Sequence, residues 1–152
     1  MAIAYFHTWT TYGTWLPGDD RGWFQRGHGL QSPNPERLFS SCLRMTDQAV
    51  VLDFSQRQVV ERVIVEHCRI RKWILHAVNC RSNHVHVAAS AGEIPIERPR
   101  EQFKSWSTRR LKELVPTREN WWTQRGWDVF IDEETHLSDV IRYIVEGQDF
   151  HR

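Results

Sequence analysis

Two apolar runs in the middle of the chain, residues 73–80 and 84–90, are separated by a connection of only three residues. Both runs contain the β-branched and apolar side chains that are typical of strands, and the connection at 81–83 is polar. A connection this short joins antiparallel strands, because parallel strands need a crossover of about a dozen residues or more. The sequence therefore predicts a β-hairpin, and the rest of the fold must be built around it.

Patterns on either side of this hairpin predict the other regular elements. Aromatic and β-branched residues predict a strand at 2–10. Helical spacing of apolar residues, with a capping-box pattern at Ser55 and Gln58, predicts a helix that starts at Ser55 and ends near Lys72. Later elements are predicted in chain order: a helix at about 100–115, a strand at 126–131, and a last helix with carboxylates at 132–134.

Between the first strand and the first helix lies a stretch that is rich in glycine and proline. Residues 12–36 contain eight residues of these two types, which predicts a long loop. Residues 37–54 are ambiguous, and no regular element is assigned to them. We therefore expect one domain over residues 1–152, with a long loop or insertion at about 13–54.

The predicted order is strand, helix, strand, strand, helix, strand and a final helix. This order is the split βαβ pattern, in which an antiparallel sheet carries helices on one face. The sequence thus predicts an α+β fold with a ferredoxin-like βαββαβ core and a C-terminal helix that carries Tyr143.

Charge along the chain is uneven, although the formal net charge is only +1. Between Arg98 and Arg118 there are seven basic and two acidic residues, whereas residues 119–152 contain three basic and eight acidic ones. A basic segment in a near-neutral chain can meet a polyanion, and it can equally be a solvated helix face. Charge alone leaves both interpretations open.

Three cysteines, Cys42, Cys68 and Cys80, have no CxxC spacing. An odd number without a framework favours reduced thiols in a cytoplasmic protein, each thiol being a small residue of the core. No apolar run is long enough to cross a membrane, and the first residues lack a signal-peptide pattern, so no membrane partner is expected.

Two histidines open the second strand of the predicted hairpin. In the run His84-Val85-His86-Val87, alternation puts both imidazoles on one face of the strand. Two neighbouring imidazoles can hold a divalent metal ion, and a tyrosine hydroxyl beside a metal suggests attack on a phosphate. Tyr143 follows on the last helix, at the border of its apolar stripe, which is also a common place for a purely structural tyrosine.

The run Asn83-His84-Val85-His86 resembles the HUH motif, in which a bulky apolar residue separates two histidines. Together with Arg142-Tyr143-Ile144, it resembles the single-tyrosine HUH transposases, which include the IS200-like insertion-sequence enzymes and the REP-associated tyrosine transposases. Two further segments are similar to the second helix and to the segment before the last strand of that family: Phe103-Lys104-Ser105-Trp106 and residues 121–127.

This resemblance, which covers about residues 2–12 and 55–149, implies a DNA transposase that cleaves and rejoins single-stranded DNA. It implies that His84 and His86 hold Mg²⁺ or Mn²⁺ on the scissile phosphate. It also implies that Tyr143 attacks this phosphate, leaving a 5′-phosphotyrosine and a free 3′-hydroxyl. The implied partner is single-stranded DNA that forms hairpins, bound in the cytoplasm at the nucleoid, and homodimers are common in the family.

The chain departs from the family at the third metal ligand. The family usually has Gln or Asn four residues after the tyrosine, and this position is Gly147 here. Glu146 and Gln148 flank it, and both are candidates. Glu146 offers a carboxylate, which suits Mg²⁺, whereas Gln148 matches the family's chemistry if Gly147 lets the helix end distort.

Basic and aromatic residues are the candidates for DNA binding. Contacts to phosphates are expected from one predicted helix, through Lys104, Arg109, Arg110 and Lys112. Stacking on unpaired bases is expected from the glycine-rich loop, through Trp15, Arg21 and Trp23.

Three alternatives stay open. A domesticated REP-associated protein, or a nicking enzyme like a replication initiator, would use the same chemistry on another substrate. A decayed, non-catalytic protein that still binds DNA hairpins is favoured by the glycine at position 147. A zinc protein would use His84, His86 and a third histidine.

Overall fold

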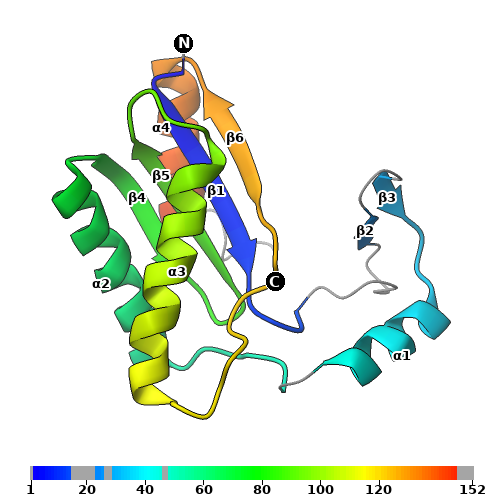
Figure 1. The fold of residues 1–152 in the computed structure, drawn as a ribbon. Coiled ribbons are helices and arrows are strands. Elements are labelled where there is room, and N and C mark those ends of the chain that lie inside the picture. Colours follow the sequence, from blue (N-terminus) through cyan, green and yellow to red (C-terminus); the bar gives the residue numbers. More distant parts are fainter. Residues whose placement is uncertain (1, 15–22, 26–28, 46–47, 147–152) are drawn as a thin grey trace.

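The computed structural model describes residues 2–14, 23–25, 29–45 and 48–146. Its centre is a four-stranded antiparallel sheet with strand order β4-β5-β1-β6 (Figure 1). The strands are β1 (Ala4–Thr10), β4 (Ile74–Cys80), β5 (His84–Ser90) and β6 (Trp127–Ile131). Because β5 lies between the parallel strands β1 and β4, the sheet has split βαβ topology. The predicted α+β class and ferredoxin-like core are confirmed.

Helices cover both faces of this sheet (Figure 1). On one face lie α2 (Phe54–Arg71) and α3 (Glu97–Leu114), and on the other lies α4 (Glu134–Val145). The larger core lies under α2 and α3, and its fully buried members include Trp9, Ile64, Val85, Val87, Phe103 and Leu111. A smaller core under α4 contains Ala4, Ala77, Ala88, Ile131, Leu137, Val140 and Ile144. The strict alternation along β5 supplies both cores from one strand.

The first helix of the core, α2, begins earlier than predicted. Its capping box consists of Asp53 and Gln56, not of Ser55 and Gln58. The carboxylate of Asp53 accepts the Gln56 N–H at 2.8 Å, and the Gln56 side chain accepts the Asp53 N–H at 2.9 Å. Aspartate caps a helix as well as serine does, so the earlier signal sets the start of the helix.

Some apolar residues of the helices are exposed and not part of either core. Ile70, Leu114 and Val145 lie in the last turns of α2, α3 and α4, where each helix extends beyond its core. Trp106, in the middle of α3, is 43 % exposed. Of the three cysteines, Cys68 and Cys80 are buried as predicted, whereas Cys42 is exposed.

The segment predicted as a long loop contains regular structure. A two-stranded sheet pairs β2 (Trp23–Gln25) with β3 (Gly29–Gln31), and α1 (Pro35–Arg44) follows. The Asn34 side chain accepts the N–H of Arg37 and Pro35 occupies the first turn, which together explain the start of α1. These elements lie beside the main sheet rather than across either face (Figure 1). Within the described ranges, no helix has the length and apolarity needed to span a membrane.

Candidate functional site

The paired histidines lie on the face of the sheet that α4 partly covers. Val85 and Val87 are buried in the core under α2 and α3, so alternation directs His84 and His86 to the opposite side. The centroids of the two imidazole rings are 4.8 Å apart. His84 is half-buried, and His86 is only 6 % exposed.

His86 belongs to a row of four side chains that crosses the whole sheet. The register pairs Asn79 with His86, His86 with Thr8, and Thr8 with Trp127. Directly opposed residues of antiparallel strands share a face, so all four side chains lie on the same side as α4. We call this set the Asn79–Trp127 row.

Each imidazole is held through its Nδ1 atom. His84 Nδ1 lies 2.7 Å from Asn83 Oδ1, and His86 Nδ1 lies 2.8 Å from Thr8 Oγ1. Because an amide oxygen only accepts, His84 donates from Nδ1, and its Nε2 carries the lone pair when the ring is neutral. The Thr8 hydroxyl is able to accept from His86 in the same way. Histidines that bind metals are oriented by such bonds at the other ring nitrogen.

His86 is a neutral imidazole near pH 7. Burial is the largest cause that lowers its pKa to about 4, and the positive charges of His84 and Arg81 act in the same direction. A histidine must be unprotonated to bind a metal ion. The environment of His86 therefore holds the ring in the form that a ligand requires.

Tyr143 lies near the end of α4 and contacts His86 of the same chain. The ring centroids are 5.4 Å apart at an interplanar angle of 80°, an edge-to-face contact. Phe6 completes a cluster of three rings: it stacks on His86 at a centroid distance of 5.5 Å and meets Tyr143 edge-to-face at 6.3 Å. Tyr143 is 40 % exposed, so its side chain is only partly covered by the rest of the protein.

The end of α4 is fixed beside the histidines by Asn79. The Asn79 Nδ2 donates to the carbonyl oxygen of Ile144 at 2.9 Å. The helix ends at Val145, and Glu146 is the exposed C-cap residue, with φ −120° and ψ −37°. Glu146 therefore lies at the helix end next to Tyr143, whereas Gly147 and Gln148 lie outside the described residues.

Sequence reasoning missed Phe6, Thr8 and Asn79 as parts of this site. Each lies on a strand of the main sheet, and its role depends on which residue of the neighbouring strand is paired with it. The polar Asn79 near the end of an apolar strand was the one local signal available.

No third histidine joins the pair within the described residues, where no group of three or more His, Cys, Asp or Glu side chains could hold a metal ion. Three other histidines have partners elsewhere: His7 bonds to Asp128, His67 to Gln102 and His76 to Ser90. The zinc alternative, which needs three histidines, has no support in this part of the chain.

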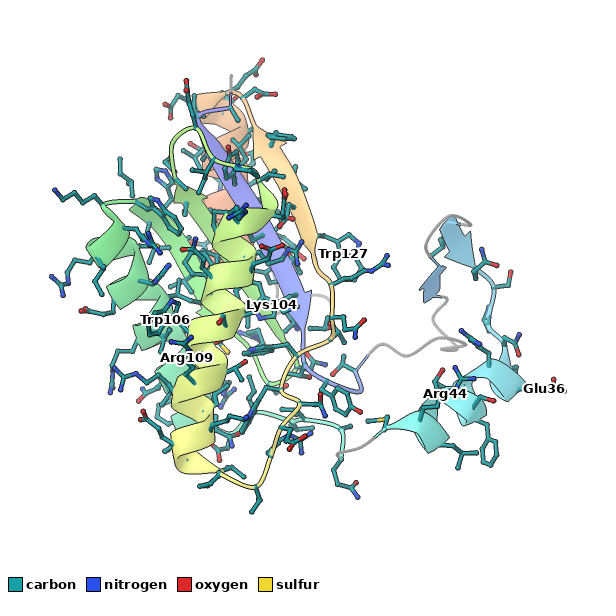
Figure 2. All side chains as sticks on the ribbon, in the orientation of Figure 1. Glu36, Arg44, Lys104, Trp106, Arg109 and Trp127 are labelled. Carbon is teal, nitrogen blue, oxygen red and sulfur yellow. The ribbon has the colours of Figure 1, made fainter. Side chains whose placement is uncertain are left out.

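The basic residues predicted to contact DNA lie on α3 (Figure 2). Lys104 Nζ donates to the carbonyl oxygens of Thr123 at 2.6 Å and Arg125 at 3.3 Å. The Arg109 guanidinium lies 4.5 Å above the Trp106 ring.

Two more of these residues, Arg110 and Lys112, are exposed on α3, and Arg110 lies 3.6 Å from Glu113. Of the loop residues predicted to stack on bases, Trp15 and Arg21 lie outside the described residues. The structure describes Trp23 only as part of the β2 backbone.

Comparisons with known proteins identify a matching family and two similar folds. The family model of IS200-like transposases matches residues 42–147. A REP-associated tyrosine transposase bound to a REP hairpin has a similar fold, with a TM-score of 0.61 and 15 % identity over 99 % of this chain and 70 % of that one. A candidate transposase from Deinococcus radiodurans gives a TM-score of 0.51 and 14 % identity over 97 % of this chain and 92 % of that one. No curated protein matches the sequence significantly.

Proposed function

Because the chain belongs to the IS200-like transposase family, we propose that it cleaves and rejoins single-stranded DNA with Tyr143 as the nucleophile. One observation supports this role above all others: the Tyr143 ring contacts His86, whose neighbour His84 shares the same face of the sheet. This contact is made within one chain.

The two histidines fit part of the ligand set of a divalent cation. Both imidazoles are oriented through their Nδ1 atoms, as metal-binding histidines are. His84 and His86 would hold Mn²⁺ or Mg²⁺. Among the described residues Glu146 does not group with the two histidines, so the third ligand would be Gln148, or Glu146 after a shift of the end of α4. When bound, the ion would polarise a phosphoryl oxygen and offset negative charge in the transition state.

Tyr143 carries the covalent step. Its phenol oxygen forms a bond to the phosphorus of the scissile phosphodiester, while the bond from phosphorus to the 3′ oxygen breaks. The phenol proton passes to solvent, and the departing oxygen takes up a proton to become a free 3′-hydroxyl. Since one phosphodiester replaces another, a 3′-hydroxyl can later reverse the reaction and rejoin a strand without ATP.

Neighbouring side chains position these groups. Thr8 fixes the orientation of the His86 ring, and Phe6 packs against the rings of both His86 and Tyr143. Asn79 ties the last turn of α4 to β4, which keeps Tyr143 beside the histidines. Such restraint matters because a reacting group that is misplaced by about 1 Å can cost about 100-fold in rate.

Hairpin-forming single-stranded DNA is the proposed substrate. Support comes from the relative whose structure contains a REP hairpin, and from the cationic side chains on the exposed face of α3. Lys104, Arg109, Arg110 and Lys112 are the proposed contacts to phosphates, which would give affinity rather than sequence recognition.

A covalent-adduct assay tests this proposal. The protein is incubated with Mn²⁺ and labelled single-stranded DNA that contains a hairpin with unpaired flanks, and the denatured products are separated by gel electrophoresis. We expect a labelled protein band that Tyr143→Phe abolishes and that His84→Ala or His86→Ala strongly reduces. Tyr12→Phe is the matched control, because it removes a phenol hydroxyl that lies at the edge of the larger core, and its adduct should persist.

Two results would count against the proposal. An adduct that persists in Tyr143→Phe would place the nucleophile elsewhere. Hairpin binding without any adduct in the unaltered protein would favour the decayed, non-catalytic alternative.

A further inference from the structure

The candidate active site and the basic face of α3 lie on opposite sides of the sheet. His84 and His86 are on the side of α4, whereas α3 covers the other face (Figure 1). A DNA strand that contacts both must pass around the sheet, whose edges are β4 and β6. Both α2 and α4 pack along β4, which leaves β6 as the less covered edge.

The β6 edge presents an exposed aromatic ring to the active-site face. Trp127 is the last member of the Asn79–Trp127 row, and it is 47 % exposed. Neighbouring strands are about 4.8 Å apart, so Trp127 stands about 10 Å from His86, across Thr8. Indole rings stack on bases of any sequence, because every base has a π-face.

A cationic groove lies immediately before Trp127 along the chain. It has a volume of about 630 Å³ and is lined by Arg100, Glu101, Lys104, Gln124 and Arg125. Gly126 joins the groove to Trp127 at a close crossing, where a Cβ atom would lie 2.5 Å from both the Thr8 carbonyl oxygen and Arg100 Cδ. The groove on the α3 side and the indole on the α4 side are therefore consecutive along one strand edge.

Two cations of the groove, Arg100 and Lys104, are fixed in place by hydrogen bonds. Arg100 binds Asp128 through Nε and Nη2, which leaves Nη1 for a further bond. Burial, followed by repulsion from Arg100, lowers the pKa of Lys104 to about 8. With Arg125 included, the groove holds three basic side chains, and a phosphodiester would supply negative charge where these cations repel each other.

We propose that the segment Gln124–Trp127 guides the single strand around the β6 edge, with an unpaired base stacked on Trp127 and a backbone phosphate in the adjoining groove. This inference rests on the proposed DNA cleavage and names the residues that hold the strand next to the cut. The base would stack beside the histidine pair, and the next part of the strand would lead to the basic face of α3.

Binding of a plain single strand tests the stacking residue separately from the chemistry. Fluorescence anisotropy with labelled oligothymidylate of about 12 nucleotides, in the presence of EDTA, measures Kd without cleavage. Trp127→Ala should raise Kd by about 5- to 100-fold, and Trp127→Phe should recover most of the affinity. Phe130→Ala is the matched control, because Phe130 is an exposed aromatic residue of β6 on the opposite face, and its Kd should stay unchanged.

The groove and the site of contact are tested in parallel. Arg125→Ala should weaken binding and reduce the slope of log Kd against log salt concentration by about one unit. Oligothymidylate that carries 5-iododeoxyuridine should crosslink to Trp127 of the unaltered protein, which mass spectrometry can identify. Equal Kd values for Trp127→Ala and Phe130→Ala, or crosslinks only at other residues, would overturn the inference. If Trp127 is needed for strand binding but the protein forms no covalent adduct, the proposed cleavage is contradicted and the inference about strand binding is not.

Discussion

Thr8 Oγ1 lies 2.8 Å from Nδ1 of His86, across the paired strands β1 and β5. Thr8 is 78 residues distant in sequence, and no local pattern connects the two. The bond orients the imidazole of His86 and engages its Nδ1 atom. Its Nε2 atom is then the one that would bind a metal ion.

Thr8→Val tests this relationship, since valine keeps the shape and removes the hydroxyl. We expect the affinity for Mn²⁺ to fall by about 10- to 100-fold, the range for partners of metal-binding histidines. Isothermal titration calorimetry measures the change. The control is Thr10→Val. Thr10 lies on β1 like Thr8 and is paired with His84 of β5, but its hydroxyl bonds to Thr123. An equal loss in both variants would show that Thr8 has no special role.

Asn79→Ala tests whether the last turn of α4 must be fixed for Tyr143 to react. Loss of the bond to the Ile144 carbonyl should slow adduct formation by about 10- to 100-fold, because the phenol is less well placed. The control is Ser90→Ala, which removes the bonds of Ser90 to Ile3 and His76 at the far end of the sheet and should leave the rate unchanged. Equal rates in both variants, measured with Mn²⁺ at saturation, would contradict the positioning role.

Asp128 joins β6 to β1 and α3 through bonds to His7 and Arg100. Burial raises its pKa, but hydrogen bonds from His7 and Arg100 outweigh burial and lower it below the ordinary value of 3.8. A lowered pKa in the folded state means that the ionised form stabilises the fold. This stabilisation is complete above about pH 4 and is lost as the pH falls through the lowered pKa.

Asp128→Ala should therefore lower the free energy of unfolding by about 3–5 kcal/mol at pH 7, since it leaves Arg100 without its counter-ion. The difference from the unaltered protein should shrink as the pH falls below the ordinary value of 3.8. Urea denaturation at a series of pH values measures both effects. Asp132→Ala is the control, because Asp132 is an exposed carboxylate just after β6, and its free energy of unfolding should change little at any pH. If the free energy lost in Asp128→Ala were the same at every pH, the charge argument would be refuted.

The three thiols should differ in reactivity. Burial raises the pKa values of Cys68 and Cys80 to about 12, whereas Cys42 is exposed on α1. In the folded protein, a disulfide reagent at pH 8 should react quickly with the thiol of Cys42 and slowly with the thiols of Cys68 and Cys80. Cys42→Ser should remove the fast phase, and a remaining fast thiol would contradict the burial of the other two.

The sequence was sufficient wherever the determining interactions are local. The hairpin of β4 and β5 follows from two apolar runs and a three-residue connection, and the shared face of His84 and His86 follows from strand alternation. Tyr143 could be placed on the last helix because helical periodicity extends over only a few residues. Local signals also compete, and the start of α2 was misplaced because Asp53 provides a capping box before the one at Ser55.

The tertiary structure alone decided which residues surround the histidines. Asn79, His86, Thr8 and Trp127 form one row, although β1, the hairpin of β4 and β5, and β6 are distant from one another in sequence. The register between β1 and its two neighbours depends on how the apolar side chains of each strand pack into the two cores. A shift of one residue would turn each of these side chains to the other face. The shared face of the two histidines was therefore readable from the sequence, whereas the residues that surround His86 are brought to it only when the strands pair.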